Sequence, residues 1–261
     1  MSFIDRERAY VRTFFPTFEW VVNTGASRRN RLSVPLAEAR IGLVSTSGAS
    51  ARGQVRFSTG DDGDASFREL GWDEPARFSH GGYDTRRAYR DPEVVLPRRT
   101  LDLLAADGTI GAAPARVFSL MGYIPDPQPL LDETGPRVAA QLLADAVDLV
   151  LLVPARPVCQ QSVGLLQRVL DEHGLATVSI SQVREVTAQV RPSLACLVET
   201  PFGLTLGAVG DHAAHARIVR HTLEAATGDH PAGTIVDLGE RWTADDERER
   251  QLAVDEIDES G

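Results

Sequence analysis

The sequence predicts an α/β fold, with a mostly parallel sheet that is doubly wound, Rossmann- or flavodoxin-like, and has helices on both faces. Short apolar runs alternate along the chain with segments whose apolar residues have helical spacing. Residues 147–153 are apolar except for Asp148, which is typical of a short buried parallel strand. After a break at Pro154, a helix is expected from Val158 onward. Pro157 suits the first helical position, where a missing N–H costs nothing.

The remaining elements follow from the same patterns in chain order. Strands are expected at 40–46, 116–120, 147–153, 176–180, 194–200 and 234–238. Helices are expected at 98–107, 136–146, from 158 to the glycine at 174, and at 211–227. Gly174 suits the position after a helix end, and Asp211 suits a helix N-cap. The apolar spacing places Leu103 and Leu143 on the buried faces of the first two helices.

Three regions are expected: an N-terminal arm at 1–39, an α/β domain at 40–240 and an acidic C-terminal tail at 241–261. The tail is expected to be a solvated helix or disordered. The arm carries four aromatic side chains that need a surface to cover, Phe14, Phe15, Phe18 and Trp20. That surface belongs either to this domain or to a partner, which is another subunit or a second copy of the chain.

Composition limits the classes of function. The chain has 261 residues, 43% of them hydrophobic and 25% charged, as in ordinary globular proteins. No apolar run is long enough to cross a bilayer, and no secretory signal is expected at the N-terminus. Two distant cysteines make no disulfide framework, so a reducing cytoplasm is the expected compartment. A net charge of −10 argues against nucleic acid as a partner.

Several kinds of chemistry lack their residues. All 27 basic residues are arginine, so the chain has no lysine for a Schiff base, for anchoring pyridoxal phosphate or for a phosphate-binding loop. The dinucleotide, zinc-protease and α/β-hydrolase motifs are also absent. No cofactor is evident from the sequence.

Cys159 is the leading candidate for a reactive group. It falls in the first turn of the expected helix, just beyond the carboxyl end of a strand, where ligands bind in open α/β sheets. The helix N-terminus and nearby Arg156 favour thiolate, so a lowered thiol pKa is expected. The alternative is that Cys159 is a small residue that fills space in the core. Cys196, inside another strand, is expected to be core.

Three histidines are weighed as functional residues. The segment from His80 through Gly81 and Gly82 can approach a ligand closely, although His80 could equally be an ordinary turn residue. His212 and His215 share a helix face, but a metal site needs a third ligand and none is near in sequence. No metal is therefore predicted, and the two are expected to be an exposed pair.

Several stretches together resemble the glycine/sarcosine/betaine reductase selenoprotein B family, with its D-proline reductase relatives. The stretches are RIGLVSTSG, ASFREL, SHGGYD, RDPEVVLP, the turn after RVFSLMGY, VDLVLLVPARPVCQQSVGLLQRVLDEHG and PFGLTLG with the following GD. They occur in the family's order over about residues 32–225. The resemblance implies reductive cleavage by a selenocysteine or cysteine placed three residues before a second cysteine.

This sequence departs from the family pattern at the redox pair. The resemblance places Cys159 on the second cysteine and Arg156 on the first position. Gln160 and Leu204 stand where histidines are common. The chain thus resembles a divergent member that has lost the redox couple, while its pocket persists.

Two hypotheses remain, and the sequence favours the first. In the first, an enzyme cleaves a C–N or C–S bond of a small anionic, amino-acid-like substrate by a reductive or a lyase-like reaction. Cys159 is the nucleophile or thiol donor, His80 is the general acid or base, and an external thiol is the reductant if the cleavage is reductive. The expected substrate-binding residues are Arg156, Ser47, Gly48, Tyr83, Gly122, Phe202 and Gly203. In the second, the chain is a non-catalytic ligand-binding or complex-forming subunit.

Overall fold

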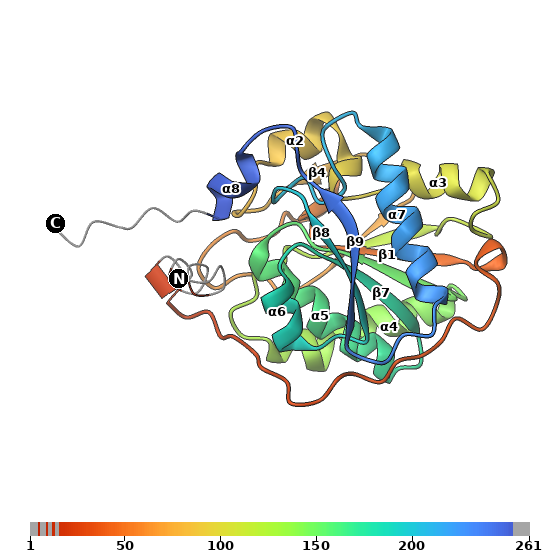
Figure 1. Cartoon of the computed structure of the whole chain (residues 1–261). Coiled ribbons are helices and arrows are strands. Elements are labelled where there is room, and N and C mark those ends of the chain that lie inside the picture. Colours follow the sequence, from red (N-terminus) through yellow and green to blue (C-terminus); the bar gives the residue numbers. More distant parts are fainter. Residues whose placement is uncertain (1–4, 6–8, 10–11, 14–15, 253–261) are drawn as a thin grey trace, which may run out of the picture.

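The computed structural model describes Asp5, Ala9, Arg12, Thr13 and residues 16–252 of the chain. Its centre is a seven-stranded sheet in the order β3-β5-β1-β6-β7-β8-β9 (Figure 1). The strands are β1 (Ile41–Ser45), β3 (Arg68–Gly71), β5 (Arg116–Ser119), β6 (Leu149–Val153), β7 (Ala176–Ser181), β8 (Leu194–Glu199) and β9 (Thr234–Arg241). All neighbours pair in parallel except β3 with β5. The parallel strands follow the flavodoxin-like order, which confirms the predicted fold class.

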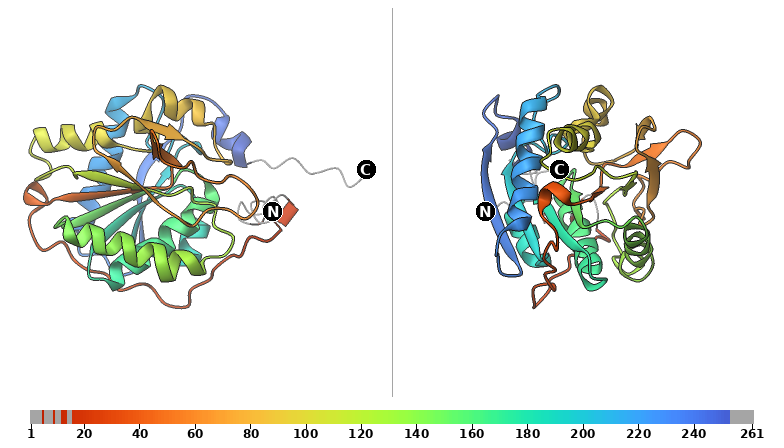
Figure 2. Two further views of the ribbon diagram at one scale, coloured as in Figure 1. Left: turned by 180° about the vertical axis from the view of Figure 1, so that it is seen from behind. Right: turned by 90° about the vertical axis from the view of Figure 1, so that its right-hand side faces the viewer.

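Helices cover both faces of the sheet. One face carries α2 (Thr85–Arg90), α3 (Arg98–Ala106) and α7 (His212–Thr227), and the other carries α4 (Gly135–Ala144), α5 (Pro157–Glu172) and α6 (Arg184–Val190) (Figures 1 and 2). Alternate residues of a strand enter the two resulting cores. In β1, Ile41 and Leu43 pack in the cluster that includes α3 and α7, whereas Val44 packs in the cluster that includes α4 and α5.

The central strand and helix form where the sequence predicts them. The strand begins at Leu149 rather than 147, because the Asp148 side chain accepts a hydrogen bond from the Arg40 backbone N–H at 2.8 Å. Pro157 is the first residue of α5, as predicted, and its missing N–H leaves no hydrogen bond unmade. Cys159 therefore lies in the first turn.

Two core predictions are wrong. Leu103 and Leu143 are 47% and 48% exposed instead of facing inward. Leu101 and Leu104, three residues apart, occupy the buried face of α3, and Leu142 does so in α4. Helical geometry leaves no room on those faces for the adjacent leucines.

Other elements were not predicted from the sequence. They are the antiparallel pair β2 (Ala49–Ala51) and β4 (Ala76–Phe78), the edge strand β3, the short helices α2 and α6, the 3-10 turns η1 (Leu36–Glu38) and η2 (Pro92–Val94), and the π-helical turn η3 (Leu130–Thr134) that leads into α4. Except for η1, η3 and α6, these elements lie in the connection between β1 and β5.

The described part of the N-terminal arm packs on its own domain. Phe18 and Trp20 join apolar clusters with core residues of the sheet edge, so these two side chains pack on this domain. Farther along, the Asn23 backbone N–H donates to Gln189, and Ser27 donates to Asp171 at 2.9 Å. Phe14 and Phe15 lie outside the described residues.

The segment after β9 is described up to residue 252. It forms the short helix α8 (Glu247–Leu252), none of whose residues is buried. Two of its side chains also hydrogen-bond to the domain. Arg248 donates to the Thr200 carbonyl at 2.6 Å, and Gln251 accepts from the Phe202 N–H at 2.6 Å. Residues 253–261 of the predicted tail lie outside the described residues.

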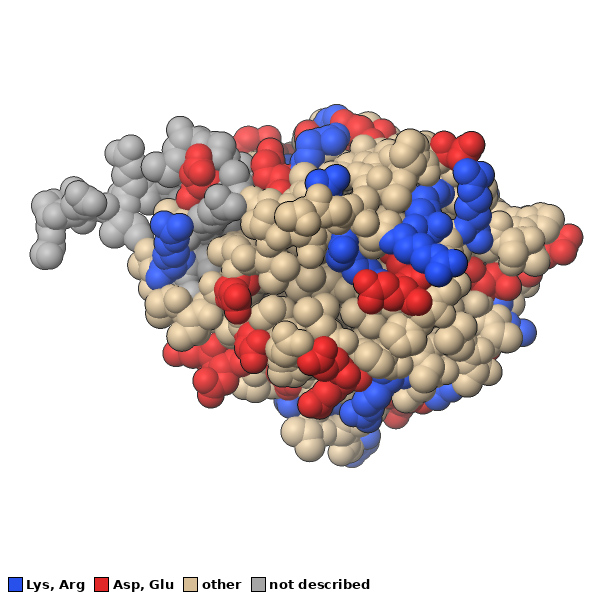
Figure 3. Space-filling view, turned by 90° about the horizontal axis from the view of Figure 1, so that it is seen from below, with Lys and Arg blue, Asp and Glu red and all other residues tan. Residues whose placement is uncertain are grey.

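No helix within the described residues has the length and apolar character needed to cross a membrane. On the face seen in Figure 3, acidic and basic side chains are interspersed, and no continuous basic surface appears there.

Asp171 generates a pH prediction because it is buried beneath the arm. Burial raises the pKa of its carboxyl to about 7, against the opposing hydrogen bonds of Thr177 and Ser27. The unfolded chain releases this proton near pH ~4, so folding takes up a proton between about pH 4 and 7. The free energy of unfolding should therefore fall as pH rises through that window, by a few kcal/mol at most.

Asp171→Asn should remove this part of the slope, as measured by urea unfolding at about pH 5 and about pH 8. The exposed Asp132→Asn variant is the control. An unchanged slope in Asp171→Asn would contradict the assignment.

Candidate functional site

The connections that follow β1, β5, β6 and β8 meet at one edge of the sheet, because parallel strands present their carboxyl ends together. β5 lies on one side of β1, and β6 and the later strands lie on the other side, so the order in which strands are added to the sheet reverses at the β1–β6 pair. Open α/β folds bind ligands at such a point. Cys159 follows β6 at this point, and Thr46 and Ser47 follow β1. The predicted location of the site is therefore a sheet edge suited to chemistry.

His80 lies directly against Cys159. Its Nε2 atom is 3.4 Å from the Cys159 sulfur. Its Nδ1 atom accepts the backbone N–H of Gly82 at 2.9 Å, and a backbone amide can only donate. The neutral ring therefore carries its proton on Nε2, facing the sulfur. His80 is placed to donate a hydrogen bond to a thiolate, rather than to accept the thiol proton.

The expected lowering of the Cys159 pKa is wrong in direction. Burial is the largest cause and raises the pKa of the thiol above its usual value. The Thr46 hydroxyl, the backbone of Ala155 and Arg156, and the Arg156 charge all act the other way. Cys159 is completely buried, so loss of hydration outweighs these stabilising groups and the thiol rests protonated.

Burial also lowers the pKa of His80 to about 3, and the nearby positive charge of Arg156 adds to this shift. The imidazole is therefore neutral near pH 7. Together the two residues form a neutral thiol–imidazole pair, not a preformed ion pair.

Glycines allow the chain to close around this pair. Gly122 has φ +88°, and a Cβ there would lie 2.4 Å from the Cys159 sulfur. Gly48 (φ +69°) passes against the backbone of Ser79, and Gly203 (φ +80°) passes against the Tyr83 ring. Any side chain at these positions would be strained and would collide with its neighbour. The predicted glycines thus shape the site by close approach.

A small cavity of about 50 Å³ opens beside His80. Its walls are Thr59, His80, Gly81, Gly82, Met121, Tyr123, Arg156 and Val158. The Arg156 side chain runs across Gly82, where a Cβ would lie only 2.1 Å from its Cδ. Of the predicted residues, His80 and Arg156 therefore meet at one cavity, next to the sulfur.

The other predicted binding residues lie outside the lining of the cavity. Tyr83 donates its hydroxyl to the Ser47 carbonyl at 2.7 Å, and its ring centroid is 4.7 Å from that of His80. Gly48 exchanges backbone hydrogen bonds with Leu120 and Ser79. Phe202 packs in a separate cluster with Val183, Val186 and Trp20. None of Ser47, Gly48, Tyr83, Gly122, Phe202 or Gly203 lines the cavity.

The arm covers this edge of the sheet. Phe18 is in the same apolar cluster as Cys159, Met121 and Val158, and its ring stacks on Tyr123 with centroids 5.6 Å apart. Buried Gln161 of α5 holds the arm in place. It accepts the Val21 N–H at 2.9 Å and donates to the Glu19 carbonyl at 2.7 Å.

Several further residues of the site were missed by sequence reasoning, among them Thr46, Thr59, Met121, Tyr123 and Val158. Thr46 hydrogen-bonds the sulfur and accepts the Ala155 N–H at 3.1 Å. The Met121 carbonyl lies 3.9 Å from the sulfur, and Thr59 lines the cavity. Only Thr46 carried a signal in the sequence, because it lies at the carboxyl end of the strand expected at 40–46.

Cys196 lies in the interior of β8, within the core that faces α7, as predicted. Burial raises the pKa of its thiol to about 12. It belongs to a different cluster from Cys159, which leaves Cys159 without a second cysteine in its own cluster among the described residues.

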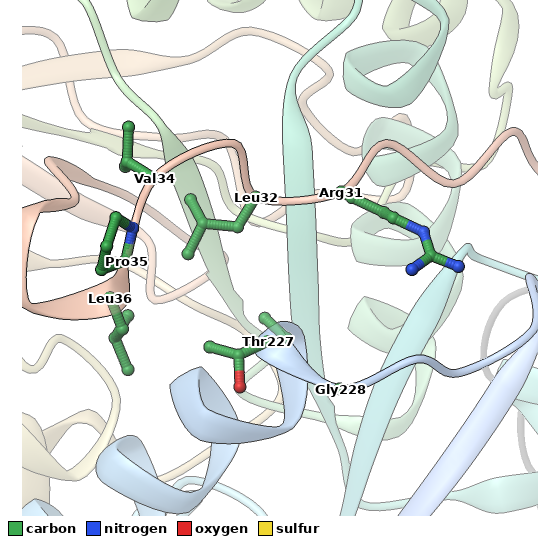
Figure 4. Close-up of a pocket in the computed structure, with 8 residues that line it drawn as sticks. Arg31, Leu32, Val34, Pro35, Leu36, Thr227 and Gly228 are labelled. Atoms are coloured by element: carbon green, nitrogen blue, oxygen red, sulfur yellow. The ribbon is translucent and has the colours of Figure 1, made fainter.

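A larger cavity, about 240 Å³, lies at the C-terminal end of α7 (Figure 4). It is bounded by residues 31–36 of the arm and by residues 226–228. Figure 4 shows Arg31 extending away from the apolar side chains of Leu32 and Leu36, and Arg31 pairs with Asp229. Without a nucleophile or acid–base group among its lining residues, this cavity is a poorer candidate for catalysis.

Thiol labelling tests the electrostatics of the site. At neutral pH, Cys159 in the native protein should react with iodoacetamide at least about tenfold more slowly than in the unfolded chain, because burial shields the sulfur and raises its pKa. Cys159 should still react before Cys196, because Cys159 contacts His80 at the cavity and burial raises the pKa of Cys196 to about 12. The rate should continue to rise above about pH 9, since the thiolate fraction is still growing there. An apparent pKa well below the ~8.5 of a free thiol would contradict this picture.

The sequence is similar to that of a known protein over most of its length. Over 212 residues, covering 80% of this chain and 87% of the relative, the sequence is 29% identical to D-proline reductase subunit gamma of Acetoanaerobium sticklandii. No protein-family model matches the sequence. No solved structure matches it. The similarity to this subunit supports a family relationship with the D-proline reductase group of proteins, in line with the resemblance seen in the sequence.

Proposed function

We propose that this protein has a reductase-like role in which Cys159 attacks a small anionic, amino-acid-like substrate. The observation that carries the proposal is the 3.4 Å contact between His80 Nε2 and the Cys159 sulfur beside a cavity that Arg156 lines. The relative's name, a subunit of D-proline reductase, supports a cyclic or D-configured amino acid as the first substrate class to test.

Each residue has a role in the proposed reaction. Arg156 binds the substrate carboxylate, for which a guanidinium provides paired donors. The Nε2–H of His80 and the Thr46 hydroxyl donate hydrogen bonds to the thiolate as it forms. The proton that the Cys159 thiol loses is transferred to the substrate nitrogen whose bond to carbon breaks.

The bond changes balance with an external thiol as reductant. The Cys159 thiolate forms a C–S bond as the C–N bond breaks, and the electron pair of that bond passes to nitrogen. One external thiol then attacks the Cys159 sulfur, so that an S–S bond forms, the C–S bond breaks and the carbon takes a proton. A second external thiol releases Cys159 and leaves with the first as a disulfide. Two thiols are oxidised, and one C–N bond becomes C–H and N–H.

Substrate entry requires the site to open. A cavity of about 50 Å³ is several times smaller than typical ligand pockets of roughly 300–1,000 Å³. Phe18 and Trp20 of the arm are the covering residues most easily displaced, because they belong to neither a helix nor a strand. Opening there would also hydrate the sulfur and remove the main cause of its raised pKa.

Cys159→Ser and Arg156→Gln test the proposed roles in the full chain, with D-proline as substrate and dithiothreitol as thiol. Wild type should convert D-proline to the ring-opened amino acid with two added hydrogens, detected by mass spectrometry. Cys159→Ser should abolish turnover but leave D-proline binding intact. Arg156→Gln should weaken binding about tenfold or more, because a charge-assisted hydrogen bond is lost.

Arg250→Gln, which alters an exposed arginine of α8, is the matched control and should behave as wild type. Turnover that survives Cys159→Ser, or D-proline binding that is unaffected by Arg156→Gln, would contradict the proposed roles.

The alternative proposal is a non-catalytic ligand-binding or complex-forming subunit. The raised pKa of Cys159 and the small size of the cavity favour it, as does the relative's name as one subunit of an enzyme. In this case the wild type binds a small acid through Arg156 without turnover, and binding survives Cys159→Ser. Exposed parts of the arm, such as Val22, would then remain available to a partner subunit or a second copy.

Phe18→Ala tests whether the arm controls access. Loss of the Phe18 ring should raise the rate of Cys159 labelling by iodoacetamide several-fold, because the apolar cluster over the sulfur is opened. Val22→Ala is the matched control, since Val22 lies in the same arm but is 64% exposed. Equal labelling rates in Phe18→Ala and wild type would contradict a covering role for the arm.

A further inference from the structure

A second group of reactive side chains lies away from Cys159, at the start of α7. His212 and His215 occupy the first turn of this helix, and Asp91 follows α2 on a segment that α7 contacts. One ligand atom from each of the three lies within 4.8 Å of the other two. The third ligand that the sequence did not supply therefore comes from a distant part of the chain.

His215 is not the exposed residue that the sequence predicts, because its side chain is completely buried. Its Nε2 lies 3.0 Å from the Ala208 carbonyl, and a carbonyl can only accept, so Nε2 carries the proton. Nδ1 therefore presents a lone pair. Among the described residues, no hydrogen-bond partner meets this atom.

The lone pair of His215 is aimed at Asp91. Nδ1 is 4.0 Å from Asp91 Oδ2, which is too far for a hydrogen bond. The Asp91 carboxylate is itself fixed by the backbone, since Oδ2 accepts the Gly210 N–H at 2.7 Å and Oδ1 accepts the Glu93 N–H at 3.1 Å. A buried acceptor facing a second, oriented acceptor needs a positive group between them.

We propose that Asp91, His212 and His215 bind one divalent transition-metal ion, for which Zn²⁺ fits the ligand set best. Two imidazoles and a carboxylate suit zinc or a neighbouring transition metal, whereas Mg²⁺ and Ca²⁺ prefer oxygen. The hydrogen bond from His215 Nε2 to a backbone carbonyl is the outer contact that metal-bound histidines usually make.

The spacing requires the three side chains to close on the ion. A tetrahedral ion with bonds of ~2.1 Å holds its ligand atoms ~3.4 Å apart, so the 4.0 Å separation of His215 and Asp91 must shrink by several tenths of an ångström, and separations of up to 4.8 Å within the group must shrink by more. His212 is exposed and can turn toward the ion, and solvent can fill the remaining position. The positive end of the α7 dipole opposes a cation, but the carboxylates of Asp91 and the N-cap Asp211 offset it.

An ion here would link two segments of the chain that also contribute residues to the Cys159 site. The segment that ends at Asp91 carries Tyr83, and the segment that leads to His212 carries Gly203, against which Tyr83 packs. The Leu206 N–H already donates to the Val94 carbonyl across the same boundary at 3.1 Å. The metal proposal stands independently of any reaction at Cys159.

Metal titration of the full chain tests the proposal directly. After treatment with a chelator, wild type should bind one Co²⁺ per chain with visible absorption bands of a nitrogen–oxygen site, and Zn²⁺ should displace it and raise Tm. His212→Ala should weaken Co²⁺ binding at least about tenfold, and Asp91→Asn should do the same. His212 is the main target because it is exposed, whereas a change at buried His215 tests folding as well.

His221→Ala is the matched control, since His221 lies on the same helix and faces Glu240 at 3.8 Å. It should keep wild-type affinity and spectrum. The proposal is overturned if wild type binds no stoichiometric Co²⁺ or Zn²⁺, or if His212→Ala binds as tightly as wild type. It is also overturned if His221→Ala loses as much affinity as His212→Ala.

Discussion

The parallel pairing of β1 with β6 determines where the chemically interesting residues lie. It brings the carboxyl ends of both strands to one edge, so that Thr46 and Cys159 become neighbours although they are far apart in sequence. The connection after β5 then returns to the same edge, where Gly122 packs on the sulfur. A different strand order would separate these groups without changing any of them.

At Cys159, burial competes with hydrogen bonding and charge. The Thr46 hydroxyl, two backbone groups and Arg156 all favour a thiolate, yet complete burial favours the thiol and prevails. In the proposed reaction, the groups that stabilise the thiolate are already in place, and only hydration of the sulfur is missing. Ionisation of Cys159 would then accompany opening of the site.

Much of the fold was predictable because parallel strands and amphipathic helices leave strong patterns. The strand at 147–153, Pro157 at the helix start and Asp211 at a helix N-cap were all read from local signals. The exposure of Leu103 and Leu143 could not be predicted, because each lies next to a leucine that occupies the buried face of its helix. The contact of His80 with Cys159, and that of Asp91 with His215, depend on tertiary packing that leaves no pattern in a single sequence.

The two hydrogen bonds between Gln161 and the arm constrain how the sequence of the arm can vary. Its carboxamide recognises only main-chain atoms at Glu19 and Val21, so the identities of those two side chains are unconstrained by it. The register of the arm, however, is set: the rings of Phe18 and Trp20 pack at the sheet edge, and Glu19 between them is exposed. Deleting Glu19 or Trp20 would bring a different side chain to the position of Phe18, so insertions and deletions there should be far less tolerated than substitutions.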